Sequence, residues 1–542
     1  MNIKEQFDEC GMTDKPCQFT VEESYLPMSD STRLYMMIYK PETCGSFPVL
    51  VQRSCYPGQM ENYRIYGEEL ARRGYGYVLQ ICRSMGKSEG VWEPNVNERK
   101  DGLELLDWLN EQEWVESIGY FGASYLALTG WAVADAVPEK VKGMMLTVYG
   151  TDRFNSAYEK RMFRHDVLTG WSMGNAGHPV LADYLESCRF RPHAKADEEL
   201  WGGRLSWYQD WIHAVKRSDR YWQQGWWKQL VEIPSKVKVP VYIVESWYDH
   251  HFGSAMNTWK ALSEETKLYS WLDIGCWNHM SSECIDWGEQ KNLENGNVKR
   301  LLEWFDLILK KKEKPCKRVR TYVMREDRWK EWEDWPLASN KTKKYFLNSG
   351  RRLDTLPGDK GEISFEYDPQ NPCPTHGAES VLTMIAEAGS LLQPEENYRP
   401  DVISFVSEPL EEELPLGGQV KVHLKVRTDV DDTAFTAKLC EVFPDGRAYN
   451  IRSGITTIAA DMPEKKTYLP GEHVNVCVDF WDIVWVIQPG SRIRLDISSS
   501  DFPQYCIHSN YAGIWSDQAK TRLAHQVIYT GDEGSYIELS EL

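Results

Sequence analysis

Long apolar segments are missing from this 542-residue chain. A helix that crosses a membrane needs about 20 consecutive, mostly apolar residues, and charged residues interrupt the apolar runs well before that length. The first ten residues, MNIKEQFDEC, also lack the apolar centre of a secretory signal. We therefore expect a protein that has no membrane partner and resides in the cytoplasm.

An excess of positive charge is absent as well. The chain has 62 Lys and Arg residues against 81 Asp and Glu residues, which gives a net charge of −19. Such a balance repels phosphate backbones and anionic lipid headgroups. We therefore expect no nucleic-acid partner, and we look for a small-molecule substrate instead.

The cysteine pattern of a disulfide framework is also missing. Thirteen cysteines are present, but their number is odd, they are scattered from Cys10 to Cys506, and no C-x-x-C pair occurs. We interpret them as the reduced thiols of a cytosolic protein. The chain contains neither internal repeats nor low-complexity tracts.

The first part of the chain alternates short apolar runs with helical patterns, as βαβ units do. A chain of this length exceeds the usual size of one core, so we expect more than one domain. The patterns predict strands at 47–52, 77–81, 118–121 and 144–148, with helices at 63–74 and 101–112. Similar strands return at 240–245 and 268–274, which predicts an insertion into one parallel sheet.

The insertion covers residues 151–235 and contains seven of the 23 tryptophans. Few of its segments alternate as strands do, so we interpret it as a mostly helical cap. After the basic run LKKKEKPCKR the pattern of apolar and polar residues changes. Apolar residues alternate with polar ones at 420–427, 474–480 and 493–497. Turns such as PGEH and QPGS separate these strands, which predicts a β-sandwich. The predicted domains are a core at 1–150 and 236–315, the cap at 151–235, and the sandwich at 316–542.

The stretch YFGASYLALTGW, residues 120–131, joins a predicted strand to a predicted helix through small residues. A tight turn of this kind exposes a serine hydroxyl, and Gly122 and Ala123 provide the space that the turn requires. The hydroxyl of Ser124 becomes a nucleophile only when a base removes its proton. The alternative is that Ser124 merely caps the helix, and the motif alone does not decide between the two.

Two further residues occupy the places where a serine nucleophile needs its partners. Strand 240–245 is followed by SWYDHHFG and strand 268–274 by GCWNHM, so Asp249 and His279 lie in successive loops after later strands. The chain order serine, acid, histidine is that of α/β-hydrolases. Taken singly, Asp249 could be a solvated carboxylate and His279 an ordinary surface or core imidazole. Their joint location favours a catalytic triad.

Many segments together resemble one family. They are RSCYPG, RSMGKSEGVWEP, GASYL, SWYDHHFG and IGCWNH in the first part, and RPDVISFVSEPL, VFPDGRAYNI, YLPGEHVNV and SSSDFPQY in the second. They are similar to the α/β-hydrolases grouped as relatives of cocaine esterase and nonactin hydrolase (CocE/NonD), in the superfamily of X-Pro dipeptidyl-peptidases and α-amino acid ester hydrolases. The resemblance extends from about Ser46 to the C-terminus. It implies an α/β-hydrolase core, a helical cap and a C-terminal jelly roll.

The resemblance also implies roles for five residues. Ser124 would be the nucleophile, His279 the base and Asp249 the carboxylate that orients the base. The oxyanion hole would consist of the hydroxyl of Tyr56 and the backbone N–H of Tyr125. A phenol stays protonated at neutral pH and donates a hydrogen bond to a developing oxyanion. Neither a cofactor nor a metal is implied, and we do not expect the adjacent His250 and His251 to bind one.

The expected reaction is hydrolysis of a carboxylic ester through an acyl-enzyme. A peptidase, an amidase or an acyltransferase would use the same triad, and a ligand-binding protein with a lapsed site is a further alternative. The amino acid ester hydrolases have carboxylates where this chain has His251 and Phe252, so a substrate ammonium is poorly provided for. This favours an uncharged or aromatic acyl group. Homo-oligomers are common among relatives, and the sequence leaves that question open.

Four positions depart from the family pattern. Relatives have Asp and Gly where this chain has Ile81 and Ser84, Gly where it has Ala127, and Pro where it has Cys276. None of these residues belongs to the predicted triad. Isoleucine at position 81 makes none of the side-chain hydrogen bonds that the usual acid would make near the site.

Overall fold

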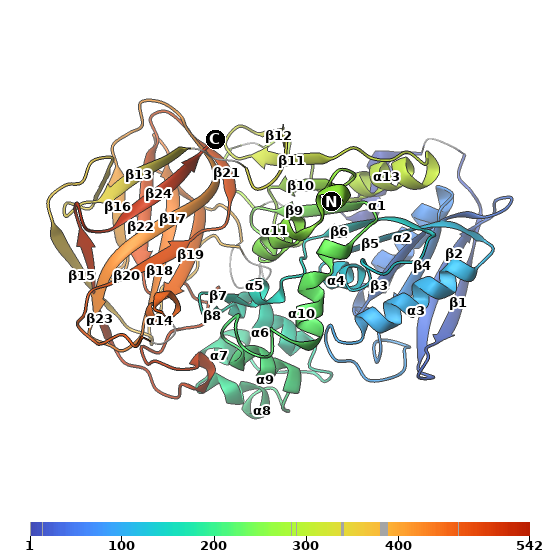
Figure 1. Ribbon diagram of the computed structural model, residues 1–542, viewed down its shortest axis with the longest axis horizontal. Helices are drawn as coiled ribbons and strands as arrows, with labels where there is room; N and C mark the ends of the chain where they lie inside the picture. The colour runs from blue at the N-terminus through green and yellow to red at the C-terminus, as the bar shows by residue number, and fades with distance from the viewer. Residues whose placement is uncertain are drawn as a thin grey trace.

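Two large sheets with a helical region between them make up the computed structural model, which describes residues 2–12, 15–282, 284–288, 290–337, 341–379, 388–463 and 466–542 (Figure 1). The first sheet belongs to the N-terminal half and the second to the C-terminal part of the chain. Within the described residues, no helix combines the length and the apolar character that crossing a bilayer requires.

The first sheet has ten strands, with a parallel centre and antiparallel edges. In spatial order they are β1 (Phe19–Pro27), β2 (Arg33–Pro41), β4 (Gly76–Ile81), β3 (Phe47–Ser54), β5 (Val115–Ala123), β6 (Val141–Thr147), β9 (Val241–Ser246), β10 (Trp271–Gly275), β11 (Arg318–Val323) and β12 (Arg328–Trp332). The six predicted strands are confirmed as β3, β4, β5, β6, β9 and β10. The sequence did not predict β1 and β2, which pair antiparallel with each other and with β4.

Helices cover both faces of this sheet. They are α1 (Ile3–Cys10), α2 (Met60–Arg72), α3 (Glu98–Glu111), α4 (Tyr125–Trp131), α11 (Phe252–Ala261), α12 (Glu264–Lys267) and α13 (Val298–Phe305), followed by a π-helical turn at Asp306–Lys310. Successive residues of β2 alternate between two cores. Met37 packs into the core with α1, α2 and α13, whereas Met36 and Ile38 pack into the core with α3.

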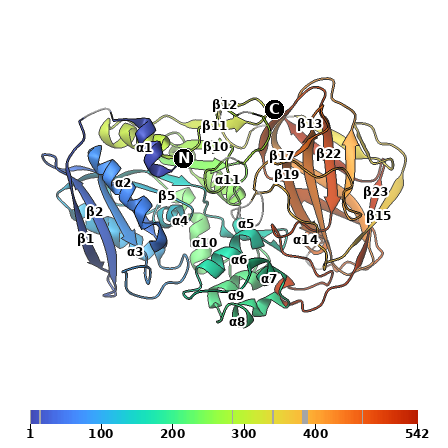
Figure 2. The ribbon, with the colours of Figure 1, turned by 180° about the vertical axis from the view of Figure 1, so that it is seen from behind.

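The insertion between β6 and β9 is mostly helical, as predicted. It contains α5 (Arg153–Ala157), α6 (His165–Gly174), α7 (Tyr184–Arg189), α8 (Ala196–Glu199), α9 (Ser206–His213) and α10 (Gly225–Glu232), and a small hairpin of β7 (Tyr158–Glu159) and β8 (Met162–Phe163). In Figures 1 and 2 these teal and green helices lie below and between the two sheets. The insertion therefore borders both the first sheet and the β-rich domain.

The second sheet runs in the order β15, β23, β17, β24, β13, β14, β16, β22, β18, β19, and β20 and β21 also pair with β17. Its strands are β13 (Lys341–Leu347), β14 (Arg352–Asp354), β15 (Gly361–Tyr367), β16 (Ile403–Ser407), β17 (Leu414–Thr428), β18 (Ala434–Val442), β19 (Ala448–Thr457), β20 (Val474–Asp479), β21 (Ile483–Ile487), β22 (Arg492–Ser498), β23 (Ala524–Thr530) and β24 (Tyr536–Glu541), with a short helix α14 (Ile458–Asp461). The three alternating segments are confirmed as parts of β17, β20 and β22. Jelly-roll topology stays a prediction.

The first sheet continues past the predicted domain boundary between residues 315 and 316, which stays a prediction. Strand β11 pairs in parallel with β10 and β12 pairs with β11, so the first sheet continues to Trp332. The change in composition near residue 315 marks the end of the helical segment after α13, where the chain re-enters the sheet. Met324, just after β11, bridges to Trp485 of β21, so this edge of the first sheet leads directly into the β-rich domain (Figure 2).

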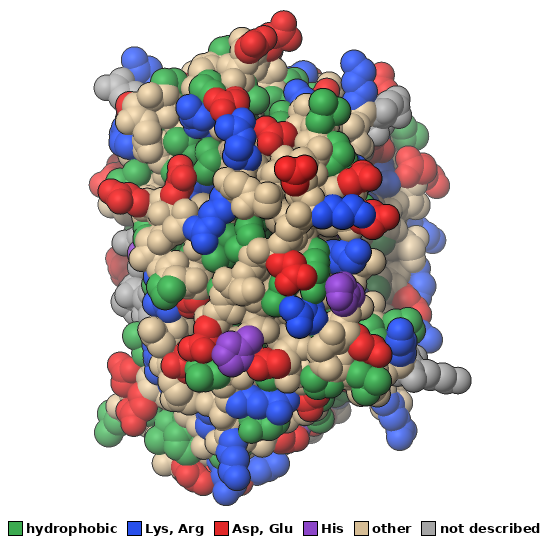
Figure 3. All heavy atoms as spheres, turned by 90° about the vertical axis from the view of Figure 1, so that its left-hand side faces the viewer, with side chains coloured by type: hydrophobic (Ala, Val, Ile, Leu, Met, Phe, Trp, Pro, Cys, Tyr) green, Lys and Arg blue, Asp and Glu red, His purple; other side chains and the backbone are tan. Residues whose placement is uncertain are grey.

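The outer face of the β-rich domain is shown in Figure 3. Positive and negative side chains are interspersed across it, with small apolar groups between them. This mixed charge pattern is typical of a solvated surface.

Candidate active site

Ser124 lies at the sharp turn between β5 and α4, with φ 57° and ψ −126°. This is a backbone conformation that residues with a side chain rarely adopt. A Cβ at Gly122 would lie 2.5 Å from the carbonyl carbon of Leu126, so only glycine fits where the helix folds back on the strand. The side chain of Ser124 makes no capping hydrogen bond to α4. The hydroxyl is therefore free of the capping role that the sequence left open.

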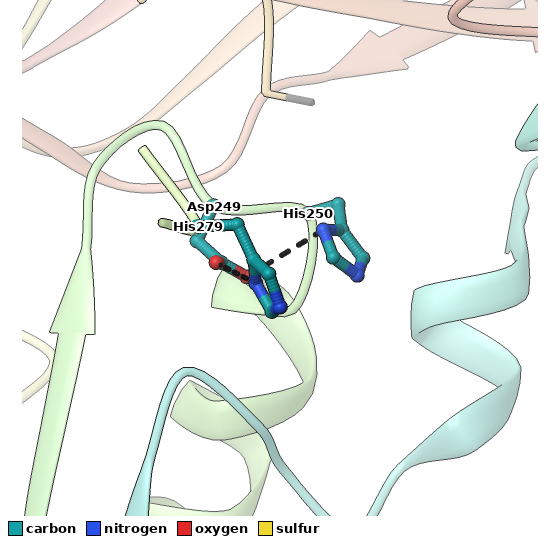
Figure 4. Close-up of side chains that lie close together, drawn as sticks. All are labelled: Asp249, His250 and His279. Atoms are coloured by element: carbon teal, nitrogen blue, oxygen red, sulfur yellow. Dashed lines mark hydrogen bonds and ion pairs between the residues drawn. The ribbon is translucent and has the colours of Figure 1, made fainter. Parts of the chain in front are cut away.

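The structure brings Ser124, His279 and Asp249 together. His279 Nε2 lies 2.9 Å from Ser124 Oγ. The Nδ1 of the same ring is hydrogen bonded to Asp249 Oδ2 (Figure 4). Asp249 is fully buried, and its other oxygen accepts the backbone N–H of His251 at 2.6 Å. The carboxylate is thereby fixed, and one imidazole spans the distance between acid and hydroxyl.

Ser246, which the sequence did not single out, ties the acid loop to the base loop. It ends β9 opposite Gly275, the last residue of β10, so the two loops start side by side. The Ser246 hydroxyl donates to the carbonyl of Trp277 and accepts the N–H of the same residue at 3.0 Å. A buried serine at the end of a strand is a weak signal in a sequence, because its partner is set by the neighbouring strand.

Tyr125 offers its backbone N–H at the first position of α4, where the helix itself provides no acceptor. Its hydroxyl is occupied elsewhere: it donates to Glu98 Oε1 at 2.8 Å and accepts the N–H of Asn95 at 2.8 Å. Glu98 in turn pairs with the fully buried Arg53 at 2.9 Å. The side chain thus anchors the start of the helix, and the backbone remains available to a substrate.

Tyr56, at the end of β3, packs its ring against Tyr125 with 6.2 Å between centroids. Burial raises the pKa of Tyr56 well above its ordinary value, so the phenol keeps its proton at neutral pH. Its oxygen accepts the indole N–H of Trp171 from the cap at 3.0 Å. Trp171 is a second residue that sequence patterns did not identify, although the tryptophan content of the cap pointed to its region.

Aromatic rings from the core and the cap form a wall around Trp171. Its ring stacks on Tyr125 at 6.1 Å and 13°, and Trp92, Trp207 and Trp211 lie 5.8 to 5.9 Å away. The wall continues directly from the two tyrosines of the predicted oxyanion hole. Tyr125, which directly follows Ser124 in the chain, joins this wall to the turn that carries the serine.

Burial keeps three titratable side chains near Asp249 neutral. Burial and the neighbouring Asp249 raise the pKa of Glu245 well above its ordinary value, so Glu245 holds a proton. Burial and nearby positive groups lower the pKa values of His250 and His251, which keeps both rings neutral. Asp249 is the acidic group that contacts the His279 ring directly.

Asp249, His250 and His279 also present ligand atoms within 4.8 Å of one another, which is close enough to hold a metal ion. His279 would have to exchange its hydrogen bonds to Asp249 and Ser124 to bind one. The expectation of a metal-free site remains a prediction.

The departures from the family pattern lie around the site. Ser84 has φ 60°, the left-handed region in which relatives place glycine. Ile81 is buried, and Arg83 is held by a bidentate pair with Asp101, both contacts at 2.7 Å. Asp101 of α3 thus supplies a carboxylate beside residues 80–84, the segment that lacks the acid that relatives have at position 81. Ala127 and Cys276 are both fully buried.

A parallel sheet that carries a serine, a histidine and an aspartate at the carboxyl ends of its strands defines a serine hydrolase of the α/β-hydrolase class. Residues 30–281 match the X-Pro dipeptidyl-peptidase (S15) family, and residues 312–538 match the X-Pro dipeptidyl-peptidase C-terminal non-catalytic domain. The chain belongs to this X-Pro dipeptidyl-peptidase-like family of α/β-hydrolases, which includes the CocE/NonD hydrolases.

Similar proteins span nearly the whole chain. The cocaine esterase of Rhodococcus sp. (strain MB1 Bresler) is 26% identical over 549 residues, which cover 90% of this chain and 92% of that protein. An aminopeptidase from a marine sediment Thaumarchaeota archaeon has a TM-score of 0.82 at 18% identity, covering 97% and 96% of the two chains. An α-amino acid ester hydrolase has a TM-score of 0.80 at 19% identity, covering 97% of each chain. The last two likenesses show the common fold.

Proposed function

We propose that this serine hydrolase cleaves carboxylic esters of small molecules through an acyl-enzyme on Ser124. The observation that carries the proposal is the continuous hydrogen-bonded chain from Ser124 through His279 to Asp249. The relation to cocaine esterase supports an ester as the substrate. No cofactor enters the proposed reaction.

In the first half-reaction His279 takes the proton of Ser124 as the hydroxyl attacks the ester carbonyl. The buried carboxylate of Asp249 stabilises the imidazolium that forms. The Tyr125 N–H and the Tyr56 hydroxyl donate to the oxygen of the tetrahedral intermediate, and His279 then protonates the departing alcohol. In the second half-reaction a water molecule repeats these steps and releases the acid.

An active-site label tests the proposal. A fluorophosphonate should modify the wild type and leave Ser124→Ala unmodified, and the same substitution should abolish turnover of a simple aryl ester. Equal labelling of both proteins would remove Ser124 from the mechanism. Absence of any aryl-ester turnover in the wild type would instead favour the ligand-binding alternative.

A peptidase or amidase is the second candidate, because the S15 match and the aminopeptidase fold are compatible with it. The triad itself serves either reaction. Matched ester and amide substrates, assayed with and without an added amine or alcohol acceptor, separate hydrolysis from amide cleavage and from acyl transfer. Faster turnover of the amide would replace the ester proposal.

The ring wall around Trp171 supports an aromatic acyl group, since flat aromatic groups pack well against indole and phenol rings.

We also infer a cytoplasmic location from the thirteen cysteines, whose odd number does not form a disulfide framework. Fractionation of the native cells tests the location.

A further inference from the structure

Arg153, the first residue of α5, is a buried cation without a counter-ion. Arg153 is only 6% exposed, and its side-chain Nε has no hydrogen-bond partner. Six other arginines are comparably buried, and each has a carboxylate oxygen within 3.7 Å: Arg53, Arg83, Arg164, Arg300, Arg452 and Arg494. Among the residues that the structure describes, no carboxylate lies within 4.0 Å of Arg153.

An unpaired guanidinium is expensive to bury, because it cannot lose its proton at any physiological pH. Stacking of Arg153 on Trp211, 4.6 Å from the ring centroid, stabilises the cation without neutralising it. The adjacent Asp152 is engaged by Arg217 through two contacts of 2.9 Å. Arg153 also hydrogen bonds the side chain of Tyr149, and burial raises the pKa of that phenol, so this partner is neutral. The described residues around Arg153 therefore leave its positive charge without a neutralising group.

The position of Arg153 connects it to the proposed oxyanion hole. The ring of Trp211 lies 5.9 Å from that of Trp171, which donates to the Tyr56 hydroxyl. On its other side, the charge of Arg153 lowers the pKa of His251, whose ring lies 5.7 Å from that of His279. Arg153 thus lies between the cap and the triad, at the far end of the aromatic wall from Tyr56.

We propose that Arg153 binds the remote carboxylate of an ester whose acyl group is an aromatic ring bearing a second, free carboxyl group. The planar guanidinium fork matches a carboxylate with two parallel hydrogen bonds, and the ring of the acyl group would lie along the wall of Trp171 and Trp211. This inference rests on the proposed ester hydrolysis. It replaces the uncharged acyl group that the sequence favours with a charged aromatic one.

Two 4-nitrophenyl esters of equal shape test the proposal: the 4-carboxybenzoate and the 4-methylbenzoate. The wild type should hydrolyse the carboxybenzoate with a kcat/KM at least about tenfold higher. Arg153→Met should lower that value about 100-fold, the size expected when a hydrogen-bonded charge pair is lost, and should leave the methylbenzoate within about threefold. Arg153→Lys keeps the positive charge but lacks the planar guanidinium. Its kcat/KM for the carboxybenzoate should lie between those of the wild type and Arg153→Met.

Arg220→Met is the matched control, because Arg220 is an exposed cap arginine whose side chain donates to Gln224. Arg220→Met should leave kcat/KM for both esters unchanged. Equal turnover of both esters by the wild type, or an equal loss of both in Arg153→Met and Arg153→Lys, would overturn the proposal and leave Arg153 a packing residue.

A binding measurement separates this inference from the proposed function. Terephthalate, the free diacid, should raise the unfolding temperature of the wild type and of Ser124→Ala, but not that of Arg153→Met or Arg153→Lys to the same extent. If terephthalate stabilises all four proteins equally or none of them, the carboxylate site is refuted. If it stabilises Ser124→Ala as expected while the wild type hydrolyses neither ester, the proposed reaction fails and the site stands.

Discussion

Trp171 is the cap residue that contacts the proposed oxyanion hole directly. A phenol has one proton and two acceptor positions. The Tyr56 oxygen accepts the indole N–H of Trp171 at 3.0 Å, which fixes the orientation of the phenol, and burial raises its pKa so that it keeps its own proton. We interpret Trp171 as a positioning residue that acts through Tyr56.

A double-mutant cycle checks this interpretation. Tyr56→Phe should lower kcat for an aryl ester by roughly 10²-fold, the usual effect of losing one oxyanion donor. Trp171→Phe should lower kcat about tenfold with little change in KM, and the double variant should be no slower than Tyr56→Phe alone. Trp207→Phe is the control, because Trp207 makes an edge-to-face ring contact with Trp171. Additive losses in the double variant would contradict a shared role.

Tyr125 separates the contribution of a side chain from that of its backbone. Its hydroxyl is bonded to Glu98 and to the N–H of Asn95, both in buried surroundings. Tyr125→Phe should therefore lower the free energy of unfolding by about 1–3 kcal/mol, because buried partners lose their hydrogen bonds. Turnover should stay within a few-fold, since the proposed donor is the N–H. Urea unfolding and an aryl-ester assay measure both; a 100-fold rate loss at unchanged stability would assign catalysis to the hydroxyl.

The small hairpin of β7 and β8 carries a carboxyl group whose protonation the fold controls. Burial raises the pKa of Glu159 from its ordinary value to about 7, although the positive charges of Arg164 and Lys160 oppose the shift. The nearest oxygen of Glu159 lies 3.7 Å from the Arg164 guanidinium, which is too far for a hydrogen bond. The native hairpin thus holds a proton that the unfolded chain releases at lower pH.

This difference predicts a pH-dependent stability. Between the unfolded pKa and about 7 the native state binds more protons than the unfolded state, so the free energy of unfolding should decrease as the pH rises through this window and level off above it. Relative to Glu159→Gln, which does not titrate, the wild type should lose up to about 3 kcal/mol between pH 5 and 8. Denaturant curves at several pH values measure the difference, and parallel profiles for the two proteins would contradict it.

At the scale of the whole molecule, the β-rich domain supports the acid loop. Arg452 of β19 donates to the carbonyl of Trp247, two residues before Asp249, and to the carbonyl of Asp482 at 2.7 Å. It also pairs with Glu379 at 2.9 Å, and both side chains are buried. The position of the Asp249 carboxylate therefore depends on a residue some 200 positions away in another domain.

Arg452→Met should consequently affect both folding and turnover. Removing one partner of a buried ion pair costs about 3–5 kcal/mol, and the released Trp247 carbonyl should loosen the Asp249 loop and lower kcat. Thermal unfolding and ester turnover measure the two effects. Arg447→Met, at an exposed position paired with Asp445, should change stability by less than about 0.5 kcal/mol. A variant at Arg452 with normal stability and rate would show that the two domains work independently.

Local chemistry made part of this molecule predictable. The strands of the parallel centre appear in the sequence as apolar runs because both faces of such a sheet are buried, and β17, β20 and β22 appear as alternations because their two faces differ. Ser124 was identifiable because Gly122 leaves room for the turn. By contrast, β1 and β2 lie at an edge, and β11 takes its place through pairing with β10, which composition near residue 315 does not reveal.

The sequence by itself determined six strands of the first sheet, the small residues of the turn, and the serine, histidine and aspartate that the structure brings together, since these patterns depend on neighbours along the chain. Only the tertiary structure decided that Trp171 bonds to Tyr56, that Arg452 holds the loop of Asp249, and that Arg153 is buried without a carboxylate. Such contacts join residues far apart in sequence, and their free energy depends on burial and on distances that exist only after the chain has folded.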